Sequence, residues 1–256
     1  MNIENRWKFA ALYALRHAFL SMVFVLVCAI CTFLLWYPTP YREIFDVTNI
    51  FLMVAFVDVV CGPLLTFILA SPTKKRREKI VDFSFIGIIQ ILALAYGMHS
   101  VWVARPAVFA FEKDRFTVIA ANEFDHENLV KAPIGLQKIP YIGLLKVATR
   151  NPENGEDFIR GIELSARGIS PAMRPDWWVP ISEQQEQLKS IVKPLTDLVA
   201  SKPEKSAELK KAADDAGYAV VALTYIPLTS SQNKDWVALL NSSLEMVGFA
   251  AVDGFE

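Results

Sequence analysis

The sequence has only three histidines and three cysteines in 256 residues, and the two types do not gather together at one place. His17, His99 and His126 are far apart in the chain, and all three cysteines precede residue 62. A metal site or a Cys–His catalytic pair needs such side chains to converge. The sequence also contains no phosphate-binding glycine loop and no nucleophile motif. We therefore expect no metal, no cofactor, no catalytic residues and no enzymatic activity.

Charged residues are missing from long stretches of the N-terminal part. Residues 1–104 contain nine Lys/Arg and six Asp/Glu, whereas residues 105–256 contain seventeen and twenty-one. The net charge of −1 averages these two unlike parts and leaves no basic excess for binding nucleic acid. The pattern predicts an α-helical membrane domain at 1–104, in contact with the lipid bilayer, followed by a water-soluble domain at 105–256.

Three apolar runs in the first part are long enough to cross a membrane. They cover about residues 18–37, 50–70 and 80–104, and none has a polar face at helical period. Twenty helical residues cover roughly the 30 Å hydrocarbon core of a bilayer. Trp36 and Trp102 lie where the first and third runs end, as aromatic residues do at a membrane interface. The sequence predicts three transmembrane helices.

The positions of the basic residues predict the orientation. Arg6, Lys8, Arg16 and the loop at 71–79 carry eight Lys/Arg, whereas the loop between the first two runs carries only Arg42. Basic loops stay in the cytoplasm. We expect a multi-pass protein of the bacterial inner membrane with a cytoplasmic N-terminus and, after three spans, a periplasmic C-terminal domain.

The pattern in the C-terminal part is that of an α+β domain. Alternating runs at 107–112 and 116–124, separated by a polar turn, predict a pair of strands. Further strands are predicted near the C-terminus at 218–228, 235–241 and 246–255. Strands at both ends with helices between them suggest the α+β class.

Three helices are predicted between these strands. One covers residues 156–167 and is ended by Gly168. Ser182 and Gln185 resemble a capping box that opens the second helix, before Pro194. The third is flanked by Pro203 at its start and Gly217 just past its end.

Asp58 is the most informative single residue, because it lies near the middle of the second apolar run. An acid at that depth costs about 2.5–3.5 kcal/mol on insertion scales, so it needs a neutral form or a partner. Gly62 lies on the same helical face, and Pro63 removes a main-chain donor. The patch is either a docking site for another transmembrane helix or, through Gln90 of the third run, a hydrogen bond that holds the bundle together. Both interpretations are open from the sequence.

Two adjacent tryptophans, Trp177 and Trp178, lie between prolines in the C-terminal domain. Such residues are either a buried lid or anchors that contact a partner. Cys28 and Cys31 form a C-x-x-C pattern inside the first apolar run, where burial makes a redox role unfavourable.

Several strings of the chain resemble the TfpX/TfpZ type IV pilin accessory proteins of Gram-negative bacteria. The strings are RWKFAALYALRHAFLSM, VDVVCGPLLTFILASPTKKRREKIVDFSFIGIIQILALAYG, VARPAVFAFEKDRFTVIAANEF and DWVALLNSSLEMVGFAAVDGF. The resemblance covers nearly the whole chain, is strongest at Asp58–Lys79 and is weakest at 151–215. It implies a chaperone-like, non-enzymatic inner-membrane protein that acts with a particular major pilin and promotes its assembly into pili. Other inner-membrane pilus assembly proteins are further candidate partners.

A pilin in the inner membrane is a single helix with a globular head outside. We therefore expect Asp58, Gly62, Pro63 and Gln90 to contact the pilin helix and the tryptophan loop to contact the head. One alternative is a membrane sensor or signalling subunit with a periplasmic ligand-binding domain, which needs a separate partner for cytoplasmic output. Another is a membrane thiol oxidoreductase, which needs cysteines facing outward.

Overall fold

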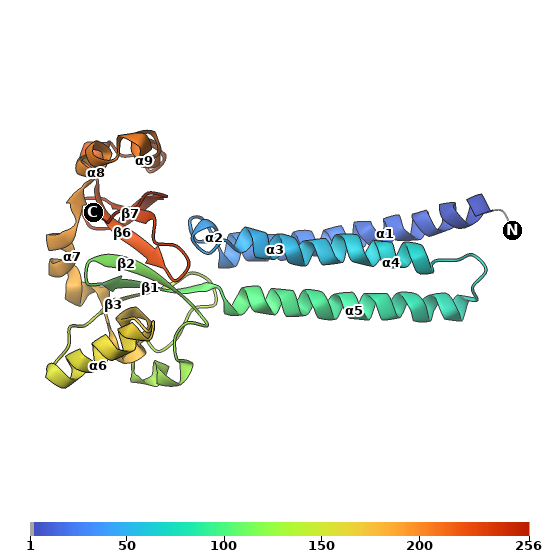
Figure 1. The fold of residues 1–256 in the computed structure, drawn as a ribbon, viewed down its shortest axis with the longest axis horizontal. Helices are drawn as coiled ribbons and strands as arrows, with labels where there is room; N and C mark the ends of the chain where they lie inside the picture. Colours follow the sequence, from blue (N-terminus) through green and yellow to red (C-terminus); the bar gives the residue numbers. More distant parts are fainter. Residues whose placement is uncertain (1–2, 256) are drawn as a thin grey trace. The chain divides into compact units, whose positions relative to one another are not determined.

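A computed structural model describes residues 3–255 and divides the chain into two compact units. The first unit ends at Val103 and the second begins at Ala104. The first unit consists of helices, and the second is built around a sheet (Figure 1).

Three long helices make up the first unit. They span Glu4–Trp36, Val47–Leu69 and Arg76–Val103, and each is long and apolar enough to cross a membrane. The three predicted apolar helices are therefore confirmed. Each begins earlier than its predicted apolar run, because the helix continues through the polar residues that precede the run. In chain order, the elements are α1 (Ile3–Ile30), η1 (Cys31–Trp36), α2 (Tyr41–Ile44), α3 (Val47–Phe56), η2 (Val57–Cys61), α4 (Gly62–Leu69) and α5 (Arg76–Val103).

The segments α3, η2 and α4 form one continuous helix, against which α1 and α5 each pack. At one end of the unit, the rings of Trp36 and Trp102 lie 4.9 Å apart in an edge-to-face contact. The Tyr37 hydroxyl donates to the main-chain oxygen of Val101 at 3.0 Å. These contacts bring the end of the first helix and the end of α5 to the same level, as the sequence predicts for the two tryptophans.

Most of the apolar surface of the three helices faces outward. In the most apolar window of each helix, 17%, 22% and 17% is buried inside the protein. A helix of a water-soluble protein buries its apolar stripe against a core. An exposed apolar surface of this extent is typical of a membrane or an interaction site.

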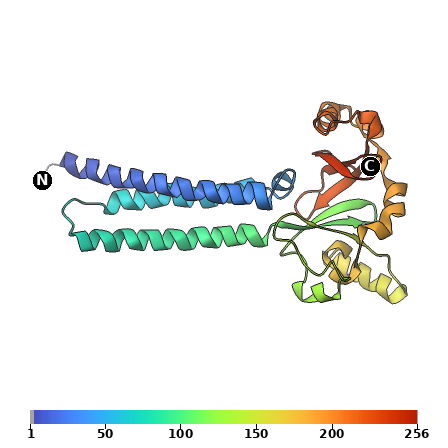
Figure 2. The same cartoon turned by 180° about the vertical axis from the view of Figure 1, so that it is seen from behind.

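The second unit contains an eight-stranded mixed sheet (Figures 1 and 2). The strands are β1 (Pro106–Glu112), β2 (Arg115–Ala120), β3 (Leu145–Thr149), β4 (Trp178–Val179), β5 (Lys193–Pro194), β6 (Thr224–Ser230), β7 (Trp236–Leu240) and β8 (Met246–Ala250). Their order is β4-β3-β1-β2-β6-β7-β8, with β5 paired to β6. The central pair β1–β2 is the antiparallel hairpin predicted from the sequence. Two pairs of strands are parallel, β1 with β3 and β2 with β6. The domain predicted as α+β is therefore a mixed α/β domain.

The helices of this unit are α6 (Gly155–Ala166), α7 (Gln185–Ile191), α8 (Leu195–Ser201) and α9 (Ser206–Asp215). Helices α6, α8 and α9 lie near the two ends of the sheet, and α7 lies beside the β1–β2 turn, where Gln187 donates to the Lys113 carbonyl. Short 3₁₀ turns connect them to the strands: η3 (His126–Lys131), η4 (Pro171–Met173), η5 (Pro175–Trp177), η6 (Ile181–Gln184), η7 (Pro203–Lys205) and η8 (Val220–Ala222). Figure 1 shows α6 on the side of β3, whereas α8 and α9 lie beside β6 and β7.

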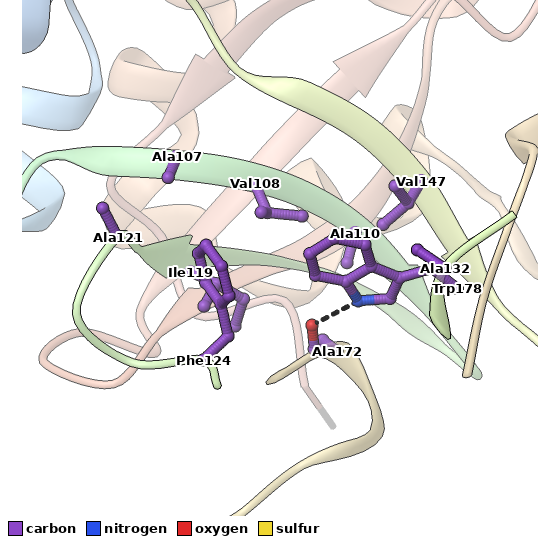
Figure 3. Close-up of a cluster of buried hydrophobic side chains, with 10 residues drawn as sticks. All are labelled: Ala107, Val108, Ala110, Ile119, Ala121, Phe124, Ala132, Val147, Ala172 and Trp178. Carbon is purple, nitrogen blue, oxygen red and sulfur yellow. Dashed lines mark hydrogen bonds between the residues drawn. The ribbon is translucent and has the colours of Figure 1, made fainter. Parts of the chain in front are cut away.

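Two buried clusters form the core of the second unit. The first joins β1, β2 and β3 to the indole of Trp178 (Figure 3). The second lies between β6, β7 and the helices α8 and α9, with Leu195, Leu198 and Leu209 fully buried. Each cluster buries apolar side chains from segments far apart in the sequence, which is the main favourable term in folding.

The predictions for the helices of this unit have mixed outcomes. The helix predicted at 156–167 is confirmed as α6, and Gly168 follows it with a φ of +83°. The helix predicted before Pro194 is found as α7, which begins at Gln185. Its capping box is wrong, because Ser182 lies in η6 and the residue before α7, Gln184, makes no side-chain capping hydrogen bond. The helix flanked by Pro203 and Gly217 is confirmed as α9 with the turn η7 before it.

Candidate functional site in the helical unit

Asp58 is the middle residue of the helix Val47–Leu69 and lies in its π-helical turn, η2. The side chain is buried, with 4% of the residue exposed. A π-turn widens the helix by one residue and often marks a functional position. This turn immediately precedes Gly62-Pro63, where the proline has no N–H to continue the regular ladder. The local sequence thus explains why the helix is irregular at Asp58.

Gln90 of α5 reaches the same point from the neighbouring helix. Its Nε2 donates to the main-chain oxygen of Asp58 at 3.0 Å. A Cβ on Gly62 would lie only 2.0 Å from that nitrogen, so the glycine makes room for the amide. The structure therefore brings Asp58, Gly62 and Gln90 together, as the sequence predicts, but the amide nitrogen binds the carbonyl of Asp58.

Two buried acceptor atoms remain at this junction. Asp58 Oδ1 and Gln90 Oε1 have no hydrogen-bond partner among the described residues. The orientation of the Gln90 amide is fixed, because the Asp58 carbonyl only accepts and must face the nitrogen. Leaving a buried polar atom unpaired costs about 1–3 kcal/mol. The helical unit thus contains two adjacent residues with unmet acceptors near its middle.

A groove of about 450 Å³ lies between α1 and α5, and both Asp58 and Gln90 line it. We call it the α1–α5 groove. Its other lining residues are mostly apolar or small, and include Ser21, Phe24, Cys28, Gly87, Ile91 and Leu94. His17 lies at one end and its Nδ1 is 2.5 Å from the Thr66 hydroxyl. The sequence does not indicate this groove, because it depends on how two helices far apart in the chain lie about a third.

The tryptophans of the second unit are buried, with 2% of Trp177 and 1% of Trp178 exposed. Trp178 Nε1 donates to the Ala172 carbonyl at 2.8 Å (Figure 3). The Trp177 ring lies between the guanidinium groups of Arg150 and Arg174, at 4.8 and 4.4 Å. Neither indole is exposed in this structure, and both pack as core residues, which agrees with the buried-lid interpretation. Their contact with a partner stays a prediction.

The buried Trp177 supports α6. A Cβ on Gly161 of this helix would lie 3.2 Å from the Trp177 ring, so the glycine allows the close approach. Asp157 of α6 accepts from Arg150 Nη1 at 2.7 Å, and this contact holds the pKa of Asp157 below its usual value. The helix is therefore fixed to the domain by one face only.

The opposite face of α6 carries exposed apolar side chains. Phe158, Ile159 and Ile162 are 53%, 59% and 54% exposed, and no described residue of α6 is buried. We call these three residues the α6 apolar face. Their spacing of i, i+1 and i+4 puts them on one side of a helix, so the sequence itself contains a signal for this face.

The remaining candidates form no site in the described residues. Cys28, Cys31 and Cys61 are free thiols, and all three belong to the apolar helices. Among residues 3–255, no group of three or more His, Cys, Asp or Glu side chains is arranged to hold a metal ion.

Fold and site together define a class of protein: three long apolar helices with a buried acid, followed by a mixed α/β domain. Comparison with known proteins narrows this class. Two fimbrial assembly proteins of Dichelobacter nodosus, from serogroups E1 and I, are each 32% identical over 254 residues, which is 99% of both chains. A third, from serogroups C1 and C2, is 38% identical over 129 residues, or 50% of this chain and 98% of that protein.

The chain therefore belongs to the fimbrial assembly protein family. A family model described as "Fimbrial assembly protein FimB" also matches residues 5–46, which cover the first helix and the loop after it. The resemblance to TfpX/TfpZ proteins is compatible with these matches. No solved structure matches the chain.

Proposed function

We propose that this protein is a non-enzymatic, chaperone-like factor of the bacterial inner membrane that binds a major type IV pilin, the fimbrial subunit, and promotes its assembly. The N-terminus is cytoplasmic, and the domain after Val103 is periplasmic. The role in assembly follows the names of relatives that match over the full length. Binding of the subunit within the membrane is the part that the geometry of the helical unit supports.

Membrane insertion is supported by the surface of the three helices. Their apolar side chains mostly face outward, where a bilayer would cover them. The contact of Trp36 with Trp102 gathers aromatic rings at one end of the unit. Aromatic side chains favour the interface between a bilayer and water, so this end marks one membrane boundary. The basic loop at 71–79 marks the other, cytoplasmic boundary.

The observation that carries the proposal is the unpartnered carboxylate oxygen of Asp58. It is buried at the centre of an apolar helix and lines an open groove. Ionisable residues within a membrane are expensive and serve a function by default. A fimbrial subunit helix that enters the groove supplies the partner that the chain itself does not provide.

The periplasmic domain gives the second contact, with the head of the subunit. Because both tryptophans are buried, we assign this contact to the α6 apolar face, which Trp177 supports. An amphipathic helix with an outward apolar face is a common element of protein recognition. Holding the subunit by its helix and its head makes the assembly factor specific for a folded, membrane-inserted subunit.

Replacing Asp58 tests the role of the groove in assembly. Asp58→Leu removes the carboxylate and keeps the number of side-chain heavy atoms, so we expect less subunit to co-purify with the chain and fewer surface fimbriae. Met53→Leu is the control, because Met53 lies on the same helix and is 72% exposed. If Asp58→Leu accumulates normally and leaves subunit capture and fimbriation unchanged, Asp58 has no part in assembly.

A further inference from the structure

The shape of the α1–α5 groove fits a helix. On α1 its lining residues run from His17 to Cys28, and on α5 from Gly87 to Met98. On each helix they recur at intervals of one, three or four residues, so they form a single stripe along one face. Twelve helical residues extend about 18 Å, or roughly three turns. The groove is thus a trough between two helices, long enough for several turns of a third.

The walls of the α1–α5 groove allow a helix to come close. Ser21 and Gly87 lie on opposite walls, and a Cβ on Gly87 would meet nothing within 4 Å. Small residues at a helix interface bring backbones together and allow van der Waals packing within a membrane. Acyl chains also fill apolar grooves, so the walls alone do not identify the occupant.

The floor of the groove contains hydrogen-bond acceptors, which a lipid tail cannot satisfy. Asp58, 96% buried, and Gln90 each keep an acceptor oxygen with no partner in the described chain. An acyl chain has no hydrogen-bond donor. Asp58 also borders a smaller hollow of about 300 Å³ between α3 and α5, but Gln90 does not line that hollow. Of these two hollows, the α1–α5 groove is the one that brings an occupant to both residues.

We propose that the α1–α5 groove seats the transmembrane helix of the fimbrial subunit, and that this helix places a hydrogen-bond donor against Asp58 and Gln90. The donor is a hydroxyl, amide or amine group at the depth of Asp58. This inference rests on the proposed function and makes it specific: the subunit is selected by one polar group in its apolar helix. A subunit helix without that group leaves both acceptors unpaired and binds more weakly.

Site-specific photo-crosslinking in cells tests which face holds the subunit. The photoreactive residue p-benzoylphenylalanine replaces Phe24 or Ile91, which line the groove on α1 and α5. The matched controls are Leu26 on α1, which is 60% exposed, and Tyr96 on α5, which is 75% exposed. Both lie on the opposite sides of their helices from the groove, and Tyr96 lines the smaller hollow beside Asp58, so it also tests that hollow. We expect adducts with the subunit from Phe24 and Ile91, and few from Leu26 and Tyr96.

Two substitutions of Asp58 test the chemistry of the floor. Asp58→Asn keeps one acceptor oxygen, and Asp58→Leu keeps none. We expect the adduct yield at Phe24 to fall in the order wild type, Asn, Leu, with a loss for Leu of about threefold to tenfold, typical of one hydrogen bond between membrane helices. Equal yields from all three chains, or equal losses for Asn and Leu, overturn the donor–acceptor pairing.

The outcomes separate this inference from the proposed function. If the subunit co-purifies with the wild-type chain but adducts form equally from Leu26 or Tyr96, the groove is not the seat, although the function stands. Adducts with lipid or with a second copy of the chain also overturn the inference. If the subunit does not co-purify at all, and fimbriae form without the chain, the proposed function fails and this inference fails with it.

Discussion

At Gly62 the second and third apolar helices approach so closely that only a hydrogen fits. The Gln90 amide occupies the space where any other residue has its Cβ, and from there it reaches the Asp58 carbonyl. A proline one residue later and a widened turn one residue earlier complete the same feature. The cluster was found from the sequence because an acid, a glycine and a proline within six residues are unusual in an apolar helix.

Gly62→Ala tests the close approach. The new methyl group displaces the end of Gln90 and breaks its hydrogen bond to Asp58, so we expect the free energy of unfolding to fall by about 0.6–2 kcal/mol. The control is Gly87→Ala, which adds the same methyl to a helix where nothing lies within 4 Å. Thermal unfolding of both variants in detergent measures the difference. If the two melt alike, Gly62 is not the contact that admits Gln90.

Two carboxylates of the second unit predict opposite dependences on pH. Burial raises the pKa of Glu112, although the nearby Arg115 acts against this. The native state therefore disfavours the Glu112 charge, and this cost appears as pH rises through the native pKa. For Asp157, the contact with Arg150 lowers the pKa, so its contribution to stability is lost as pH falls through the native pKa.

We therefore expect Glu112→Gln to gain stability relative to wild type as pH rises from 4 to 8. Asp157→Asn is expected to be less stable than wild type above pH 4, and this difference shrinks as pH falls below 4. The tryptophan fluorescence of the detergent-purified chain during urea unfolding measures both. A pH-independent difference for Glu112→Gln would mean that its charge is not disfavoured by burial.

Local sequence patterns are sufficient to predict some of the helices and strands. The hairpin β1–β2 and the helix α6 were predicted because alternation, turn residues and a terminal glycine act over short distances. The capping box failed because Ser182 lies in η6, a tighter turn, and α7 begins only at Gln185. The parallel pair β2–β6 joins residues more than 100 positions apart, and no local pattern encodes such a register.

The α6 apolar face gives a prediction for the periplasmic contact. Replacing Phe158 and Ile162 together by serine removes exposed apolar surface, so we expect the fold to survive while subunit capture and fimbriation fall. Glu163→Ser is the control, an exposed position of the same helix outside the apolar face. Co-purification of the subunit with each variant is the measurement. Full capture by the double variant would remove α6 from the contact.

On the scale of the whole molecule, similarity to fimbrial assembly proteins extends over both units, since 99% of the chain is matched at 32% identity. The family relationship therefore concerns the helices and the domain together. The sequence was sufficient for the number of helices, because hydrocarbon length and apolar composition are properties of single segments. The sequence was insufficient for the groove. The groove arises because α1 and α5 both pack against the helix formed by α3, η2 and α4 and leave a space between them.

The proposed contact with both the helix and the head of the fimbrial subunit depends on the orientation of the chain across the membrane. A domain in the cytoplasm never meets the head of the subunit. Eight Lys/Arg on one side against one on the other predict a periplasmic C-terminus. Fusions to the C-terminus measure this directly. Alkaline phosphatase becomes active only in the periplasm. Green fluorescent protein fluoresces in the cytoplasm and stays dark when it is exported through the general secretory route. A periplasmic C-terminus gives an active phosphatase fusion and a dark fluorescent one. A fluorescent fusion together with an inactive phosphatase would place the domain in the cytoplasm.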